Sequence, residues 1–65
     1  MPSISENIQR LLDQRGLYAK PVATAAGLGE TAILDILAGR SKSPRFATIS
    51  KIAAYFEVDV AEIVD

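Results

Sequence analysis

The sequence predicts an all-α domain, a compact bundle of five short helices. Five segments repeat apolar side chains at helical spacing, and glycine, proline or a capping residue marks most of their ends. The weakly alternating stretch YFEVDV is too short for a convincing strand and lacks a partner strand. A chain of 65 residues, 49% of them hydrophobic, allows one small core. We therefore expect a single domain over residues 1–65, which can also be the N-terminal part of a longer protein.

The first two helices are expected on either side of Gly16. In SISE, Ser3 can cap the first helix and Glu6 can complete a capping box. Gly16 suits the end of this helix because glycine tolerates left-handed backbone. The second helix is expected over residues 20–26, with Pro21 in its first turn, where no N–H is needed. The expected apolar faces consist of Ile4, Ile8, Leu11 and Leu12 in the first helix and Val22, Ala23 and Ala26 in the second.

The remaining three helices have similar end signals. The third is expected over residues 30–38, between Gly29 and Gly39. The fourth is expected to begin at SPRF, with Ser43 as cap and Pro44 at the first helical position. A last turn or two follows in DVAEIV, which also has capping-box spacing. The expected buried residues are Phe46, Ile49, Ile52, Ala53 and Phe56 in the fourth helix and Val60, Ile63 and Val64 in the fifth.

The second and third helices and the turn GLG between them have the pattern of a helix-turn-helix. Ala23 is small where the third helix must cross the second. Gly27, four residues later, permits the turn without a Cβ clash. Leu28 can plug the space beneath the turn, and Ile33 and Ile36 have the spacing of residues that face the second helix.

The segment LYAKPVATAAGLGETAILDILAGRSKSPRFATISKIAAYFEVDVAEI resembles the Xre or lambda-repressor-like helix-turn-helix domain. GRSKSPRF is similar to the segment between helices three and four of the 434-type phage repressors. ISKIAAYFEVDVAEIV is similar to the end of the family's domain. The resemblance extends from Ile4 to Ile63. It implies a sequence-specific DNA-binding transcriptional regulator, a repressor of phage or prophage type that binds a palindromic double-stranded operator as a homodimer.

The resemblance also implies which residues face DNA. In such repressors the third helix enters the major groove and the second lies across the backbone. The implied reading face consists of Glu30, Thr31, Leu34 and Asp35, with Gly29 and Ala38 beside them. The implied phosphate contacts are Lys20, near Ala19, and the basic loop, residues 40–45, with Arg40, Lys42, Ser43 and Arg45. Arg45 matches an arginine that lies by the minor groove in 434-type proteins, where the deformability of the central bases is read.

The charge distribution is compatible with this assignment but does not establish it. The net charge is −1, yet residues 1–56 carry seven Lys and Arg and four Asp and Glu. Four of those cations lie between Arg40 and Lys51, and residues 57–65 are acidic. Local clusters matter more than total charge for docking on phosphates. On charge alone, an ordinary solvated surface is an equal alternative.

The reading face departs from the family's usual Gln, Asn, Ser or Arg. Glu30 and Asp35 can accept a hydrogen bond from a cytosine amino group, and Thr31 or Leu34 can touch a thymine methyl. Alternatively, Glu30 only stabilises the start of a helix and Asp35 pairs with Arg40 on the surface. Leu34 is expected to be exposed unless a base, a partner chain or a sister subunit covers it. A second function is therefore open: a helical protein-interaction domain that kept the fold but lost DNA reading.

Other functions lack support in the sequence. There is no cysteine and no histidine, which removes disulfides, thiol chemistry, the commonest metal ligand and the commonest general base. We therefore expect neither an enzyme nor a metal or other cofactor. No apolar run reaches the ~18–20 residues of a membrane span, and no signal peptide is recognisable. The expected location is the cytoplasm, in association with the nucleoid.

Overall fold

Five α-helices make up the computed structural model, which describes residues 3–64. They are α1 (Ile4–Arg15), α2 (Ala19–Ala25), α3 (Ala32–Leu37), α4 (Phe46–Phe56) and α5 (Val60–Val64). No strand occurs within the described residues, and the predicted all-α fold is confirmed. No helix in this part of the chain is long and apolar enough to span a membrane.

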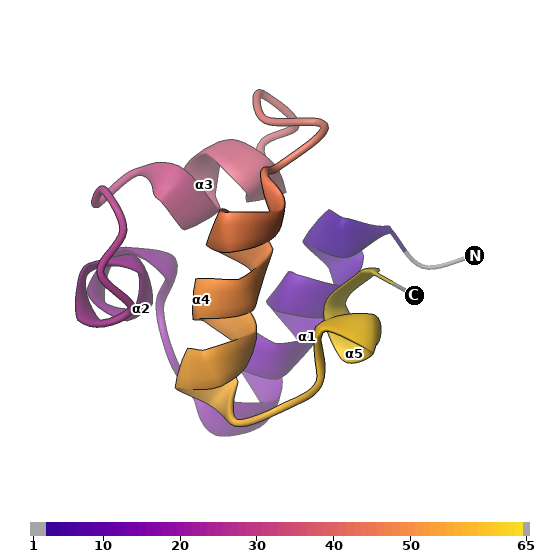
Figure 1. The fold of residues 1–65 in the computed structure, drawn as a ribbon. Coiled ribbons are helices and arrows are strands. Elements are labelled where there is room, and N and C mark those ends of the chain that lie inside the picture. Colours follow the sequence, from indigo (N-terminus) through magenta and orange to yellow (C-terminus); the bar gives the residue numbers. More distant parts are fainter. Residues whose placement is uncertain (1–2, 65) are drawn as a thin grey trace.

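In Figure 1, α4 runs through the middle of the view, with α2 on one side of it and α5 on the other. α3 packs against α1 and α2, and α5 packs against α1 and α4. The connection from α3 to α4 projects beyond the helices at the end of the molecule where α3 lies (Figure 1). The arrangement therefore places α3 and the basic loop at one end of the bundle.

Every helix contributes to a single core, as the apolar periodicity predicts. Deeply buried side chains in α1, α2 and α3 include Ile8, Val22 and Ile33. Partly buried Leu17, Leu28 and Leu37 pack against the core, and so do residues of the α4–α5 region. The buried core residues are Ile8, Leu11, Leu12, Ala19, Val22, Ala23, Ile33, Ile36, Ile49, Ile52, Ala53, Phe56 and Ile63.

The ends of α1 confirm their sequence signals. The Ser3 hydroxyl accepts a hydrogen bond from the Glu6 N–H at 3.1 Å, and the Ser3 N–H donates to the Glu6 carboxylate at 3.1 Å. Gly16 closes the helix in left-handed conformation, with φ of 63°. In α2, Pro21 lies in the first turn as predicted, although the helix begins one residue earlier than expected.

The predicted starts of α3 and α4 are wrong by two residues each. Thr31 precedes α3 with non-helical backbone, and the Ala32 N–H donates to the Gly29 carbonyl in a tight turn. Arg45 precedes α4 with extended backbone (ψ of 151°), and no side chain caps this helix, so Ser43 is not its cap. An extended residue spans about 3.3 Å against about 1.5 Å in a helix, so this conformation lengthens the connection from α3.

Two predicted core residues lie on the surface. Phe46 is 72% exposed, because it is the first residue of α4 and lies one turn beyond Ile49, the first buried residue of that helix. Val64 is 46% exposed at the end of the short α5, where only Ile63 is fully buried. Helical spacing places such residues on the correct face, but it does not show where the neighbouring helix ends.

A buried amide joins α1 to α5. Asn7 is 1% exposed, and its Nδ2 donates to the Ile63 carbonyl at 2.7 Å. Its Oδ1 accepts from Arg10 Nη1 at 3.1 Å, so both ends of the amide are hydrogen-bonded. The pair lies 56 residues apart in the chain and fixes α5, which is too short to be stable alone.

We predict that Asn7→Ala lowers the free energy of unfolding by about 1–3 kcal/mol, because it leaves the carbonyl of Ile63 without its donor. Urea denaturation followed by circular dichroism measures the change. Gln9→Ala is the control on the same helix: it removes an exposed hydrogen bond to Asp13 and is expected to change stability by no more than about 0.5 kcal/mol. Equal losses in the two variants would contradict the role of the buried amide.

Candidate nucleic-acid interface

α2, the turn and α3 form the predicted helix-turn-helix. Ala23 is fully buried where the two helices meet, and Ile33 and Ile36 are buried on α3. The Leu28 N–H donates to the Ala23 carbonyl at 2.8 Å, which closes the turn, and the half-buried Leu28 side chain packs against the core. The scaffold roles of these residues are confirmed.

Gly27 is required in the turn, as predicted, because of its backbone conformation. Its φ is 81°, in the left-handed region, but nothing lies within 4 Å of the position of an added Cβ. A Cβ in this conformation would crowd only the adjoining backbone, so the predicted need for glycine, to turn without a Cβ clash, is confirmed.

We predict that Gly27→Ala costs about 1–2 kcal/mol of stability, the penalty of left-handed backbone for a residue with a Cβ. Gly29→Ala in the same turn is the matched control. Its φ lies outside the left-handed region and an added Cβ meets nothing, so the variant is expected to be neutral or more stable by up to about 1 kcal/mol. Thermal unfolding of both variants tests this, and a Gly29→Ala variant as unstable as Gly27→Ala would refute it.

The reading face lies on the outer side of the turn and α3. Glu30 and Thr31 are exposed in the turn just before the helix, and Leu34 is 42% exposed on the helix itself. Asp35 is half-buried in the first turn of α3. The expected exposure of Leu34 is confirmed, and the structure brings the four residues together on one surface.

Both acids of the reading face lie beside a cation that was expected to bind phosphate. Asp35 Oδ1 lies 2.9 Å from Arg40 Nε, which confirms the alternative that these side chains pair. Glu30 Oε2 lies 3.8 Å from Lys20 Nζ on α2. Glu30 precedes the cap of α3, so its carboxylate does not lie in the first turn of that helix. It pairs with Lys20 instead. The Lys20–Glu30 pair is long and exposed on both sides, so it contributes little to stability and can open when a ligand arrives.

The basic loop begins at α3 and remains attached to it. The backbone N–H groups of Arg40 and Ser41 both donate to the Asp35 carbonyl, at 2.9 and 3.0 Å. Beyond this anchor, the side chains of Lys42, Ser43 and Arg45 are exposed. Within residues 3–64, neither Lys42 nor Arg45 forms an ion pair.

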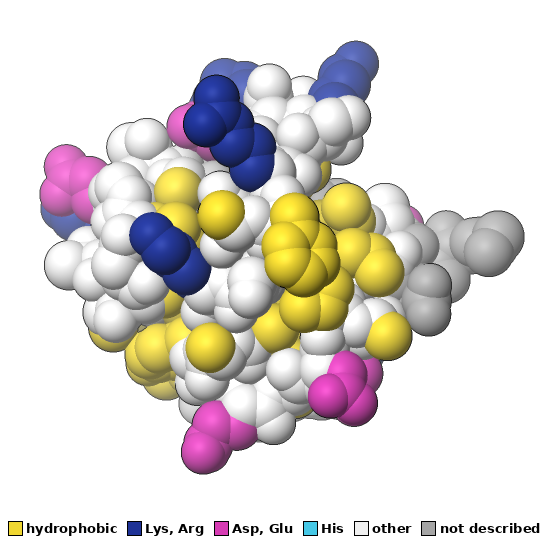
Figure 2. Space-filling view, viewed as in Figure 1, with side chains coloured by type: hydrophobic (Ala, Val, Ile, Leu, Met, Phe, Trp, Pro, Cys, Tyr) yellow, Lys and Arg dark blue, Asp and Glu magenta, His cyan; other side chains and the backbone are white. Residues whose placement is uncertain are grey.

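Most cations of this face lie at one end of the molecule. Figure 2 shows Lys and Arg side chains gathered at the end formed by α3 and the basic loop, with a few acidic side chains beside them, whereas only Asp and Glu side chains are seen at the opposite end. The latter end includes the connection from α4 to α5, where Glu57 and Asp59 are exposed. A net charge of −1 therefore coexists with a basic surface that can attract a polyanion.

The start of α1 also borders the basic loop, which sequence reasoning did not find. An open cavity of about 230 Å³ lies between them, with Ser3 and Ser5 on one side and Ser41 and Lys42 on the other. The two segments are distant in the chain, so no local pattern indicates that they meet. No group of three or more acidic, histidine or cysteine residues in the described ranges could hold a metal ion.

Comparison with known proteins agrees with this geometry. The profile of the Cro/C1-type HTH DNA-binding domain matches residues 7–65. An uncharacterized HTH-type transcriptional regulator of Coxiella burnetii (strain RSA 493 / Nine Mile phase I) is 30% identical over 64 residues, which is 98% of this chain and 30% of the relative. The chain thus spans about 30% of that relative's length, and no solved structure matches it. The chain belongs to the Cro/C1-type helix-turn-helix family of DNA-binding transcriptional regulators, which are not enzymes.

Proposed function

We propose that this domain binds a palindromic DNA operator as a homodimer and represses transcription, as a regulator of phage or prophage type. The observation that supports this most is the position of α3 and the basic loop on one end of the molecule (Figures 1 and 2). A helix about 10–12 Å across fits the major groove of B-DNA, which is about 12 Å wide. The proposed location is the cytoplasm, on the nucleoid.

In this proposal each part of the surface has its own contact. The reading face meets base edges, with Leu34 suited to a thymine methyl. Lys20 meets a phosphate beside α2 when its weak pair with Glu30 opens. Lys42 and Arg45 neutralise phosphates of the strand beside the loop, and the Ser43 hydroxyl donates to one.

Selection of bound sequences from a random DNA pool, followed by fluorescence titration at low and high salt, tests this function. About 3–4 phosphate contacts per subunit give a plot of log affinity against log salt with a slope near −3 per subunit. Selected DNA is expected to bind more tightly than scrambled DNA at every salt concentration. Binding that is absent, or equal for all sequences, would refute the proposed function.

Exposed apolar residues of α4 and α5 support the homodimer. Phe46 and Val64 are 72% and 46% exposed on two helices that pack together. In Figure 2, hydrophobic side chains gather beside α4 on the side where α5 lies. We propose that the sister subunit covers part of this surface when both bind DNA.

The spacing of half-sites gives a quantitative check on the dimer. Two subunits related by a two-fold axis bind half-sites centred about 10 base pairs apart, one turn of DNA. Inserting about 5 base pairs at the centre places the half-sites on opposite faces of the duplex. We predict that this insertion abolishes cooperative binding and leaves only single-domain affinity in a gel-shift titration, whereas an insertion of about 10 base pairs is less harmful. Equal effects of the two insertions would indicate independent monomers.

A protein-interaction domain remains the second candidate, and one observation favours it. Leu34 is exposed on the reading face, and the two acids of that face pair with Lys20 and Arg40. A complex with a protein partner that is lost in Leu34→Ala, in a domain without sequence-dependent DNA binding, would support this function. Retained DNA binding in Leu34→Ala would count against it.

A further inference from the structure

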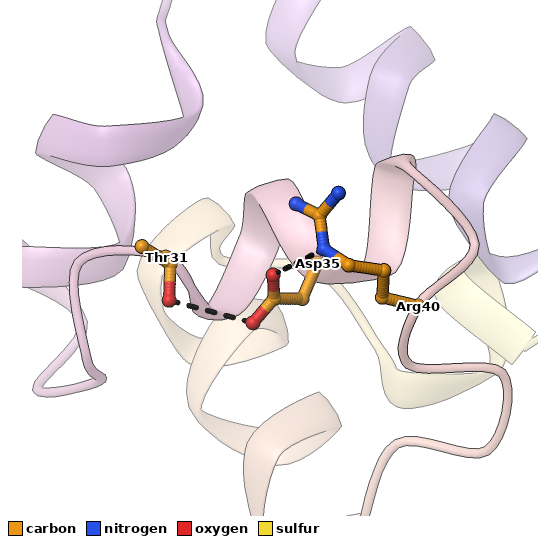
Figure 3. A network of polar contacts seen from close by, with 3 residues as sticks. All are labelled: Thr31, Asp35 and Arg40. Carbon is orange, nitrogen blue, oxygen red and sulfur yellow. Dashed lines mark hydrogen bonds and ion pairs between the residues drawn. The ribbon is translucent and has the colours of Figure 1, made fainter.

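Arg40 lies after α3 in the chain, but its side chain folds back onto the helix. Figure 3 shows the guanidinium against Asp35, with Thr31 on the other side of the carboxylate. Arg40 Nε donates to Asp35 Oδ1 at 2.9 Å, and the Thr31 hydroxyl is 3.4 Å from Oδ2. Both oxygens of the carboxylate therefore have a partner within the domain, although the contact to Thr31 is long.

The backbone reinforces this placement. The N–H groups of Arg40 and Ser41 both donate to the Asp35 carbonyl, so the chain leaves α3 in a fixed direction. Asp35 thus holds Arg40 through its own backbone and through its side chain. The Arg40 side chain remains 65% exposed, so the fixed guanidinium is accessible to a ligand.

The contact through Nε leaves the other end of the guanidinium free. In Figure 3 the two terminal nitrogens of Arg40 point away from Asp35. Arginine paired in this way presents two parallel N–H donors, which match the O6 and N7 acceptors of guanine. This is the commonest specific contact between a side chain and a base in the major groove.

We propose that Arg40 reads a guanine in the major groove and that Asp35, supported by Thr31, is its positioning residue. This inference rests on the proposed DNA-binding function. It replaces two expectations from the sequence: that Arg40 grips a phosphate, and that Asp35 accepts a hydrogen bond from cytosine itself. Asp35 neutralises Arg40 and repels phosphates, so the pair is poorly suited to the backbone, whereas Lys42 and Arg45 have no ion pair in the described chain.

Arg40→Ala tests base reading against phosphate binding. In sequence selection, the variant is expected to lose its preference for guanine at one position of each half-site. Its affinity for the selected DNA is expected to fall between about 5-fold and about 150-fold, with little change for DNA lacking that guanine. The salt slope is expected to stay the same. Lys42→Ala is the control for a phosphate contact: it weakens all sequences equally and reduces the slope by about 0.9.

Asp35→Ala tests the positioning role. The variant is expected to lose preference at the same base pair as Arg40→Ala, and the freed charge of Arg40 is expected to raise non-specific affinity and the salt slope by up to about 0.9. Adding Arg40→Ala to Asp35→Ala is expected to cause no further loss of preference. Circular dichroism and the unfolding midpoint show that each variant is folded.

The possible outcomes separate this inference from the proposed function. If the unaltered domain binds no DNA, the proposed function fails. If it binds, but Arg40→Ala weakens all sequences equally and reduces the slope, Arg40 is a phosphate contact and the inference is overturned. If Asp35→Ala changes preference at a base pair that Arg40→Ala leaves intact, Asp35 reads a base itself and its positioning role is overturned.

Discussion

Phe56→Ala is expected to unfold a large fraction of the domain. Phe56 is fully buried at the end of α4, and the Arg15 guanidinium carbon lies 5.3 Å from the centre of its ring. Truncating a buried phenylalanine costs about 3–5 kcal/mol, since it removes apolar contacts and leaves a cavity. A domain of this size has a total stability of only about 3–10 kcal/mol. Urea denaturation followed by circular dichroism at 222 nm (a far-ultraviolet wavelength, about the helix minimum) measures the loss.

Phe46→Ala is the matched control for this experiment. It makes the same chemical change at the other end of the same helix, where the ring is 72% exposed. The expected change in stability is within about 0.5 kcal/mol, the usual range for surface substitutions. The apolar periodicity of the sequence predicts that both rings are buried, whereas the structure buries only Phe56. Comparing the two variants therefore tests the structure against the prediction from periodicity. Similar losses in both variants would show that Phe46 is also buried.

The fold could be predicted from the sequence because local signals and the apolar pattern agree. Ile8, Val22, Ile33 and Ile52 are buried as their spacing predicts, and the capping box at Ser3 forms. In this chain the signals at the helix ends and the apolar pattern between them indicate the same helices. A small domain is predictable when the local preferences of its residues agree with the packing of the whole fold.

The ends of the helices could not be predicted equally well. Phe46 continues the apolar stripe of α4, but the neighbouring helices do not extend far enough to cover it. Ser43 and Pro44 form a good start signal, yet neither is helical, and Arg45 after them has extended backbone. Where a helix ends against its neighbours depends on distances between elements, about which local sequence contains little information.

For the candidate site, the sequence could supply the residues but not their partners. The pairing of Asp35 with Arg40 is one of two alternatives that the sequence leaves open, and the structure shows that this pair forms. The contact between Lys20 and Glu30 joins two helices and has no local signal. The sequence presents Arg40 as a loop cation that binds phosphate, whereas in the structure its guanidinium is held against Asp35 of α3.

The double variant Lys42→Ala/Arg45→Ala is expected to weaken the binding of every DNA sequence strongly. Both cations are exposed in the basic loop, and neither has an ion pair within residues 3–64. Each phosphate contact contributes about −0.9 to the salt slope, which corresponds to a factor of about 8 in affinity at 0.1 M salt. Loss of both contacts is expected to weaken binding by about 60-fold at that salt and to reduce the slope by about 1.8.

Arg10→Ala/Arg15→Ala is the control of equal charge. Both arginines lie on α1, outside the loop, and their removal changes the net charge of the chain by the same amount. Because Arg10 donates to Asn7 and Arg15 lies over the Phe56 ring, circular dichroism must first show that this variant is folded. If net charge governed binding, the two double variants would lose affinity equally. If the location of the cations governs it, the α1 variant keeps nearly the full slope, because a cation off the interface releases few counterions. An equal loss of affinity in the two folded variants would show that the basic loop does not contact the DNA preferentially.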